Sequence, residues 1–196
     1  MNGRLVYGRG IYEKGLHLGS IGGVQTREYL TWKQMLGRCY CTPYLNLYPS
    51  YKGCEVSENF KNFQFFAEWC NQQIGFGNKG WQLDKDILVR GNKLYSETTC
   101  CFVPKEINNL FTLSGAKRGE YLIGVSFNRK VGKYQSSIKI DGRHIKLGYF
   151  HSEEDAFLCY KKAKESRIKD LAEKYKQEIN PMTYQSLIGW GVDVQD

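Results

Sequence analysis

The stretch from Lys117 to Phe150 has the strongest charge bias in the sequence, and its charges are mostly of one sign. It holds eight basic residues against two acids, Glu120 and Asp141, so its net charge is 8 − 2 = +6, out of +8 for the whole chain. A local block of basic residues attracts polyanions and is typical of phosphate binding. The alternative is an ordinary solvated surface, which usually mixes the two signs.

The seven cysteines are a second set of residues with chemical potential. They include Cys39-x-Cys41, Cys54, Cys70 and the adjacent pair Cys100-Cys101. Spacings of one residue or none rarely place two thiolates on one tetrahedral ion, and the sequence has no Cys-x-x-Cys pair. An odd number of cysteines also argues against a disulfide framework. We therefore expect buried thiols that pack as small apolar side chains, and no structural zinc.

The composition is typical of a folded cytoplasmic protein. Hydrophobic residues make up 41% of the chain and aromatic residues 14%, which is enough to form a core. No apolar run approaches the roughly 20 residues that a membrane span needs. The first residues lack the apolar segment of a signal peptide. We expect a cytoplasmic protein without membrane association, and the composition leaves its oligomeric state open.

Three strands and one helix are predicted to position the basic stretch. The strands are expected at residues 121–127, 133–140 and 144–150, with Asp141-Gly142 as a strong hairpin signal. Ser152-x-x-Asp155 is a capping box, and the apolar spacing that follows predicts a helix to about Lys176, closed by Pro181. This pattern predicts a three-stranded antiparallel sheet packed on one helix.

Alternation along these strands predicts which side chains face away from the helix. Ser136 and Ile138 share the inner face of the second strand, and Leu147 points inward from the third. The opposite, open face collects polar and basic side chains and no acid: Ser126, Asn128, Arg129, Lys133, Gln135, Lys139, His144 and Lys146. We expect this face to contact double-stranded DNA.

This part of the chain closely resembles the APETALA-type DNA-binding domain, found in plant ethylene-response factors and phage homing endonucleases. The matching residues are Ile123-Gly124-Val125, Gly132-Lys133-Tyr134, Ile138-Lys139, Leu147-Gly148-Tyr149-Phe150 and Glu154-Asp155-Ala156-Phe157. The resemblance implies that the eight open-face positions contact DNA. The plant domains present several Arg and a Trp on this face, whereas Ser, Gln, Lys and His stand here. Fewer Arg–guanine pairs imply more reliance on phosphate contacts.

The N-terminal part is predicted to combine short strands with helices. Residues 1–30 are rich in glycine and suit an extended arm or short strands. Apolar spacing predicts helices over residues 27–39 and from Ser57, and a short helix is expected over 105–111. Prolines and tyrosines in residues 42–53 predict a loop pinned by aromatic packing, and residues 82–103 suit a strand, a turn around Arg90-Gly91-Asn92 and a second strand.

Several motifs in this part resemble a branch of phage HNH-like proteins. They are Trp32-x-x-Met35-Leu36-x-Arg38-Cys39-Tyr40, Tyr51-Lys52-Gly53-Cys54, Leu83-Asp84-Lys85-Asp86-Ile87, Gly91-Asn92, Tyr95-Ser96 and Asn108-Asn109. An HNH site of the ββα-metal type consists of two strands and a helix around one divalent metal. The resemblance implies Asp84, Lys85, Asp86 and Asn92 as catalytic residues, with Asp84, Asp86 and Asn108 as ligands of Mg²⁺ or Mn²⁺.

Lys85 stands where HNH proteins have the histidine that takes a proton from the attacking water. A lysine between two carboxylates has its ammonium form stabilised, so its pKa should rise and its strength as a base should fall. Lys85 would then hold a phosphate or stabilise the leaving group. The alternative for Asp84-Lys85-Asp86 is a solvated turn with a local ion pair.

Taken together, the sequence predicts an α+β protein of two parts. We expect an HNH-like nuclease region over residues 1–112, a linker over 113–120, the APETALA-type domain over 121–180 and a tail over 181–196. The first functional hypothesis is a metal-dependent phage-type DNA endonuclease or nickase. The alternative is a catalytically inactive DNA-binding protein that acts as a regulator or anti-defence factor. A zinc-stapled protein-binding module is a third, weaker hypothesis.

Overall fold

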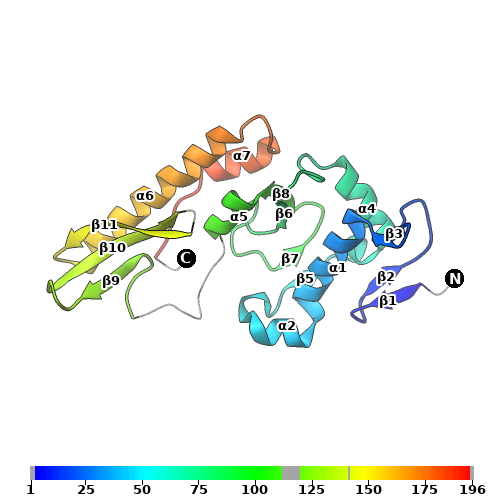
Figure 1. The fold of residues 1–196 in the computed structure, drawn as a ribbon, viewed down its shortest axis with the longest axis horizontal. Helices are drawn as coiled ribbons and strands as arrows, with labels where there is room; N and C mark the ends of the chain where they lie inside the picture. Colours follow the sequence, from blue (N-terminus) through cyan, green and yellow to red (C-terminus); the bar gives the residue numbers. More distant parts are fainter. Residues whose placement is uncertain (1–2, 112–119, 141, 195–196) are drawn as a thin grey trace. The chain divides into compact units, whose positions relative to one another are not determined.

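The computed structural model describes residues 3–111, 120–140 and 142–194. The linker expected at 113–120 lies outside these ranges, except for Glu120. The described residues form mixed α+β structure, which confirms the expected class (Figure 1). They divide into two compact units: unit 1 contains Met1–Asn108 and Gln177–Thr183, and unit 2 contains Asn109–Lys176 and Tyr184–Asp196.

The C-terminal residues do not form the separate tail expected from residue 181. Pro181 begins helix α7 (Pro181–Ile188), because proline suits the first turn of a helix. Leu187 and Val192 are buried, and Val192 belongs to the core of unit 2. Residues 181–192 are therefore part of the folded structure.

The centre of unit 1 is an aromatic core between helices α1 (Arg27–Tyr40) and α4 (Phe63–Gln72). Trp32 of α1 and Phe63 of α4 are fully buried, with their ring centroids 5.4 Å apart. Two short antiparallel hairpins form the N-terminal arm. Their strands are β1 (Arg4–Val6) with β2 (Gly10–Tyr12), and β3 (Ser20–Ile21) with β4 (Val24–Gln25).

Residues 42–53 are largely helical, so the expected loop is wrong. They form α2 (Thr42–Leu47) and the 3-10 turn η1 (Pro49–Tyr51), and each element has a proline at its first turn. The expected aromatic packing is present. Ser57 caps the N-terminus of the predicted helix, as expected. The helix is split into α3 (Glu58–Lys61) and α4, because the Asn62 side chain caps the N-terminus of α4.

Two small sheets follow in unit 1. Strands β6 (Trp81–Asp84) and β8 (Cys101–Pro104) pair antiparallel, and α5 (Lys105–Phe111) begins directly after β8, as expected. The strand nearest the Arg90-Gly91-Asn92 turn is β7 (Leu94–Tyr95), which pairs in parallel with β5 (Glu55–Val56) rather than with β6. The residues between β6 and β8 thus form a long connection rather than a simple hairpin turn.

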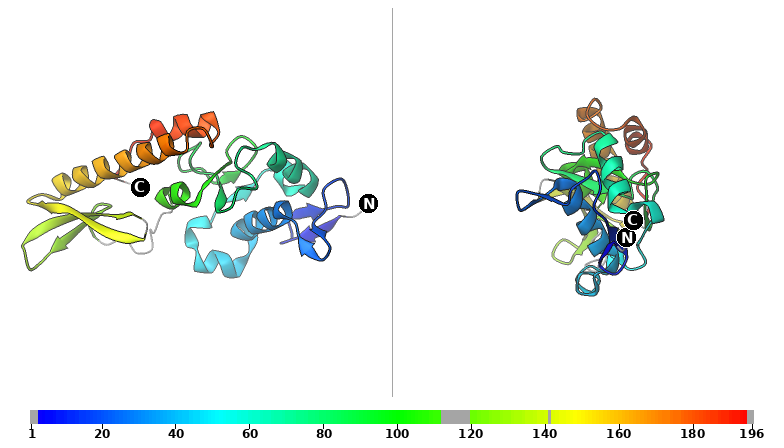
Figure 2. Two further views of the ribbon diagram at one scale, coloured as in Figure 1. Left: turned by 45° about the horizontal axis from the view of Figure 1, so that its top comes forward. Right: turned by 90° about the vertical axis from the view of Figure 1, so that its right-hand side faces the viewer.

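Unit 2 contains an antiparallel sheet of order β11-β10-β9 packed on one long helix. The strands are β9 (Val125–Asn128), β10 (Lys133–Ile140) and β11 (Arg143–Phe150), and the helix is α6 (Glu153–Lys174). The capping box is confirmed, because the Ser152 Oγ accepts from the Asp155 N–H at 3.1 Å. Helix α6 lies along one face of the sheet (Figure 2).

Close contact between α6 and the sheet depends on one glycine. Gly124, just before β9, has a φ of +78°, and a Cβ built there would lie 2.1 Å from the Tyr160 ring. Tyr160 and Phe157 of α6 pack with Ile138 of β10 in the core of unit 2. No helix in the described part of the chain is long and apolar enough to span a membrane.

Candidate functional site

The face of the sheet that points away from α6 is called here the outer face. Ser136 and Ile138 of β10 are buried on the inner side, so their neighbours Gln135, Ser137 and Lys139 point outward. Cross-strand partners share a face. The pairs on the outer face are Lys133 with Asn128, Gln135 with Ser126, Ser137 with Lys146, and Lys139 with His144.

A β-bulge in the pairing of β10 and β11 changes which residues point outward. Ser136 lies opposite Gly148 and Ser137 opposite Lys146, so Leu147 is the extra residue. Leu147 still packs against the core, as predicted. Beyond the bulge the alternation is reversed, and Tyr149 lies opposite Gln135 on the outer face. Sequence reasoning missed Tyr149, although a glycine inside a strand, here Gly148, often marks a bulge.

Tyr149 is held on the outer face by two neighbours. Its hydroxyl oxygen accepts from the Asn128 Nδ2 at 3.2 Å and from the Lys146 Nζ at 3.4 Å. The Lys146 ammonium also lies 4.7 Å from the centroid of the Tyr149 ring, a cation–π distance. These contacts place an aromatic hydroxyl and a positive charge side by side on the outer face.

Asn128 and Arg129 contribute differently from what the sequence predicts. The Asn128 Oδ1 accepts from the backbone N–H groups of Lys130 and Val131, so its amide also shapes the β9–β10 turn. Arg129 lies just after β9 in this turn and is exposed. The turn therefore presents Arg129 and Lys130 at the edge of the outer face rather than on it.

The outer face has one sign of charge among the described residues. Lys133, Lys139, His144 and Lys146 are placed there, and none of the described residues on this face is an acid. Asp141, which follows β10 in the sequence, lies outside the described residues. A cluster of acids is found in the first turn of α6, at Glu153, Glu154 and Asp155. The arrangement can bind a polyanion across the sheet.

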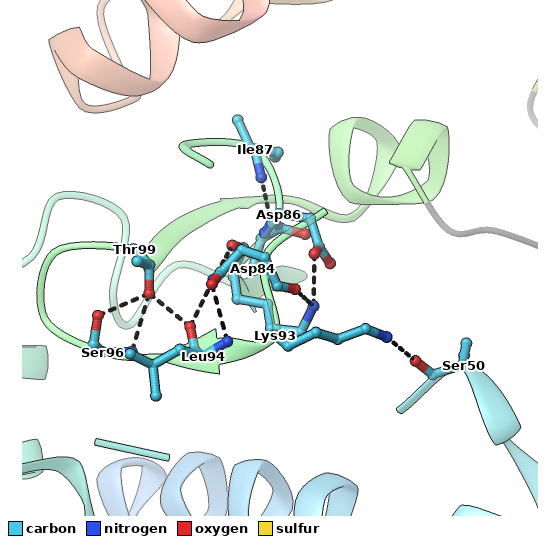
Figure 3. A network of polar contacts seen from close by, with 10 residues as sticks. Ser50, Asp84, Asp86, Ile87, Lys93, Leu94, Ser96 and Thr99 are labelled. Atoms are coloured by element: carbon cyan, nitrogen blue, oxygen red, sulfur yellow. Dashed lines mark hydrogen bonds and ion pairs between the residues drawn. The ribbon is translucent and has the colours of Figure 1, made fainter. Parts of the chain in front are cut away.

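The second candidate site lies in unit 1, at the end of β6. Asp84 is buried, with 7% of its surface exposed, and its Oδ1 accepts from the backbone N–H groups of Asp86 and Ile87, both at 2.8 Å (Figure 3). Burial raises the pKa of the Asp84 carboxyl to about 6, and the bond from Ile87 partly opposes this rise. Asp84 thus closes a tight turn.

Lys85 and Asn92 hold together the loop that follows Asp84. The Lys85 Nζ donates to the Asp86 Oδ1 at 2.6 Å and to the Asn92 carbonyl at 2.7 Å, and it lies 5.8 Å from the Tyr95 ring centroid. The Asn92 Nδ2 donates to the carbonyls of Lys85 and Leu94. Lys85 is only 6% exposed, whereas the Asp86 side chain is 39% exposed, so the local ion pair predicted from the sequence exists but its ammonium is buried.

The structure brings the four predicted catalytic residues into this one loop, and the predicted ligand Asn108 is not part of it. Asn108 lies on α5, and its Nδ2 donates to the Gln82 Oε1 of β6 at 2.6 Å. One oxygen of Asp84 is bonded to two backbone amides, and Asp86 is paired with a buried ammonium. In the described ranges no three His, Cys, Asp or Glu side chains are grouped to hold a metal. In this arrangement the donors do not fit a divalent ion.

The cysteines follow the expectation of packed, unbonded thiols. All seven are free, and five are buried: Cys39, Cys54, Cys70, Cys100 and Cys101. Burial raises the pKa of the Cys39 and Cys101 thiols to about 12, so these groups remain protonated and weakly nucleophilic.

Neither site can be assigned by likeness to another protein. No family model matches the chain, and no characterised protein or solved structure matches it either.

Proposed function

We propose that the protein binds double-stranded DNA through the outer face of the unit 2 sheet. The observation behind this proposal is the concentration of Lys133, Lys139, His144 and Lys146 on a face without a described acid. An exposed surface that serves only solubility usually mixes both signs of charge. A face with cations and neutral hydrogen-bonding groups suits the phosphates and base edges of a duplex.

The side chains on this face favour phosphate contacts over base reading. Lysine binds phosphate as a point charge, and the outer face has no arginine on its described strand positions to pair bidentately with guanine. Gln135 and the serines can donate to or accept from base edges. We therefore expect binding with modest sequence preference and a strong dependence on salt.

Tyr149 adds a directed hydrogen bond to this proposal. Its oxygen already accepts from Asn128 and Lys146, so its own O–H is available to donate to a phosphate oxygen. A phenol that accepts from an ammonium is polarised and becomes a better donor. The bulge would then matter for function, since it is what turns Tyr149 outward.

The test compares duplex binding by the full chain and two variants at low salt. Fluorescence anisotropy with a labelled duplex should show strong binding by the wild type and weaker binding by Lys139→Ala/Lys146→Ala. Lys162→Ala is the matched control, because Lys162 is equally charged and exposed but lies on α6. Equal affinity of the wild type and the double variant would reject the proposal, and so would an equal loss in the control.

Phosphodiester hydrolysis is a second candidate function, favoured by one observation. Strands β6 and β8 pair antiparallel and lead directly into α5, which is the strand–strand–helix order expected of the ββα-metal type. The donors around Asp84 do not fit a metal as arranged, so we derive no catalytic step. Incubation of the protein with supercoiled plasmid and Mg²⁺ or Mn²⁺ tests this candidate. Absence of nicking would leave the protein as a non-catalytic DNA-binding protein.

A further inference from the structure

Helix α2 and the turn η1 present a stack of tyrosines at the surface of unit 1. The ring centroids of Tyr44 and Tyr48 lie 4.6 Å apart and those of Tyr44 and Tyr51 lie 5.7 Å apart. Tyr48 is 45% exposed and the neighbouring Leu47 is 70% exposed. Neither element buries any residue. Tyr51 packs against the core of unit 1, but the exposed Tyr48 ring does not belong to that core.

Positive charges surround this stack. The Arg38 guanidinium lies 5.8 Å from the Tyr51 ring centroid, and the Lys93 Nζ donates to the Ser50 carbonyl of η1 at 2.8 Å (Figure 3). Lys52 follows η1 directly and is exposed. We call these residues the tyrosine patch: Arg38, Tyr44, Tyr48, Tyr51, Lys52 and Lys93.

Negative charge is scarce around the tyrosine patch. Residues 38–54 contain no Asp or Glu. Asp86, whose charge reaches Tyr51, is neutralised by its bond to the Lys85 ammonium at 2.6 Å. Glu55 of β5 is an exposed acid at the edge of the patch, since its backbone N–H donates to the Lys93 carbonyl at 2.7 Å, so one negative charge stands against the three cations. The patch therefore combines one exposed aromatic ring, that of Tyr48, with a net positive charge.

We propose that the tyrosine patch binds a single strand of nucleic acid with unpaired bases. An exposed ring such as Tyr48 can stack on a base of any sequence, while Lys52 and Lys93 meet the phosphates on either side. In an intact duplex the base faces are covered by neighbouring bases, so an exposed ring finds no partner there. The surrounding cations favour a polyanion over an apolar protein surface. This site is separate from the outer face and does not depend on the function proposed for it.

The experiment uses a labelled oligothymidylate of about 12 nucleotides, a length that one single-strand site can cover. The protein carries Lys139→Ala/Lys146→Ala, so that the outer face contributes little to binding. In this background Tyr48→Ala should weaken binding at least about fivefold, the lower limit for one stacked base. Tyr48→Phe should retain the affinity, because phenylalanine stacks as tyrosine does. An oligouridylate of equal length distinguishes RNA from DNA as the preferred strand.

Phe65→Ala is the control, since Phe65 lies on α4 of the same unit and is 40% exposed. It should leave the affinity for the oligonucleotide unchanged, and thermal melts should show that every variant is folded. Duplex binding by Tyr48→Ala in the otherwise wild-type chain should equal that of the wild type. The proposal is overturned if the oligonucleotide does not bind at about 50 mM salt. It is equally overturned if Tyr48→Ala binds the strand as tightly as Tyr48→Phe.

Discussion

The substitution Asp84→Asn tests whether the Asp84 side chain serves to close a turn or must be ionised to function. Asparagine keeps the side-chain oxygen that accepts from the Asp86 and Ile87 amides, and it cannot ionise. Burial raises the pKa of Asp84 from 3.8 to about 6 in the folded chain. The difference of about 2 units corresponds to roughly 3 kcal/mol at 1.36 kcal/mol per unit.

The sign follows from comparing the folded and unfolded chains. The carboxyl loses its proton near pH 3.8 when unfolded and near pH 6 when folded. The stabilisation from the protonated group is therefore complete below about pH 3.8 and is lost as the pH rises through 6. Roughly 1.4 kcal/mol of the change falls between pH 5 and pH 7.5, where most other carboxylates are already ionised.

Thermal melts of wild type and Asp84→Asn at pH 5 and pH 7.5 measure this effect. The variant should melt above the wild type at pH 7.5, and the gap should be roughly 3–6 °C smaller at pH 5. Comparing the two gaps cancels the pH dependence of all other groups. A gap that is the same at both pH values, or that favours the wild type at pH 7.5, would refute the structural role of a buried, desolvated Asp84.

Three further substitutions test individual contacts. Asn92→Ala removes the side-chain amide that bonds the carbonyls of Lys85 and Leu94, so it should lower the free energy of unfolding, measured by urea titration, by about 1–3 kcal/mol. An unchanged urea midpoint would show that the loop does not need these hydrogen bonds. Gly124→Ala places a Cβ 2.1 Å from the Tyr160 ring at a φ of +78°, so it should lower the free energy of unfolding by about 2 kcal/mol or more. A melting temperature equal to that of the wild type would contradict the close packing of α6 on the sheet. Tyr149→Phe removes one hydroxyl and should weaken duplex binding about threefold to tenfold without lowering the melting temperature; wild-type affinity would exclude a DNA contact by that group.

The elements of unit 2 could be predicted closely because their signals are local. Asp141-Gly142 predicted the β10–β11 turn, Ser152-x-x-Asp155 predicted the start of α6, and β10 spans the residues expected for it. The bulge at Ser136/Ser137 depends on the register of two strands, which alternation within one strand does not define. For this reason Tyr149 was missed from the sequence. Of the eight open-face positions predicted, seven lie on the outer face, and Arg129 lies in the turn after β9.

Unit 1 could be predicted less well, since its small sheets join distant segments. The parallel pair β5–β7 and the antiparallel pair β6–β8 both bridge long stretches of chain, which short-range patterns do not indicate. The prolines of residues 42–53 suggested a loop, although they occupy first turns of helical segments. The burial of Lys85 depends on the Asn92 carbonyl and the Tyr95 ring, so neighbouring residues alone could not reveal it.

The salt dependence of duplex binding tests the central proposal most directly. The logarithm of the binding constant of the wild type should fall linearly with the logarithm of the salt concentration, because each lysine–phosphate contact releases counterions. In Lys139→Ala/Lys146→Ala the slope should be smaller by about 2, one for each lost contact, and in Lys162→Ala it should be unchanged. A slope that is the same in the wild type and the double variant would contradict the assignment of the outer face as the DNA-binding surface.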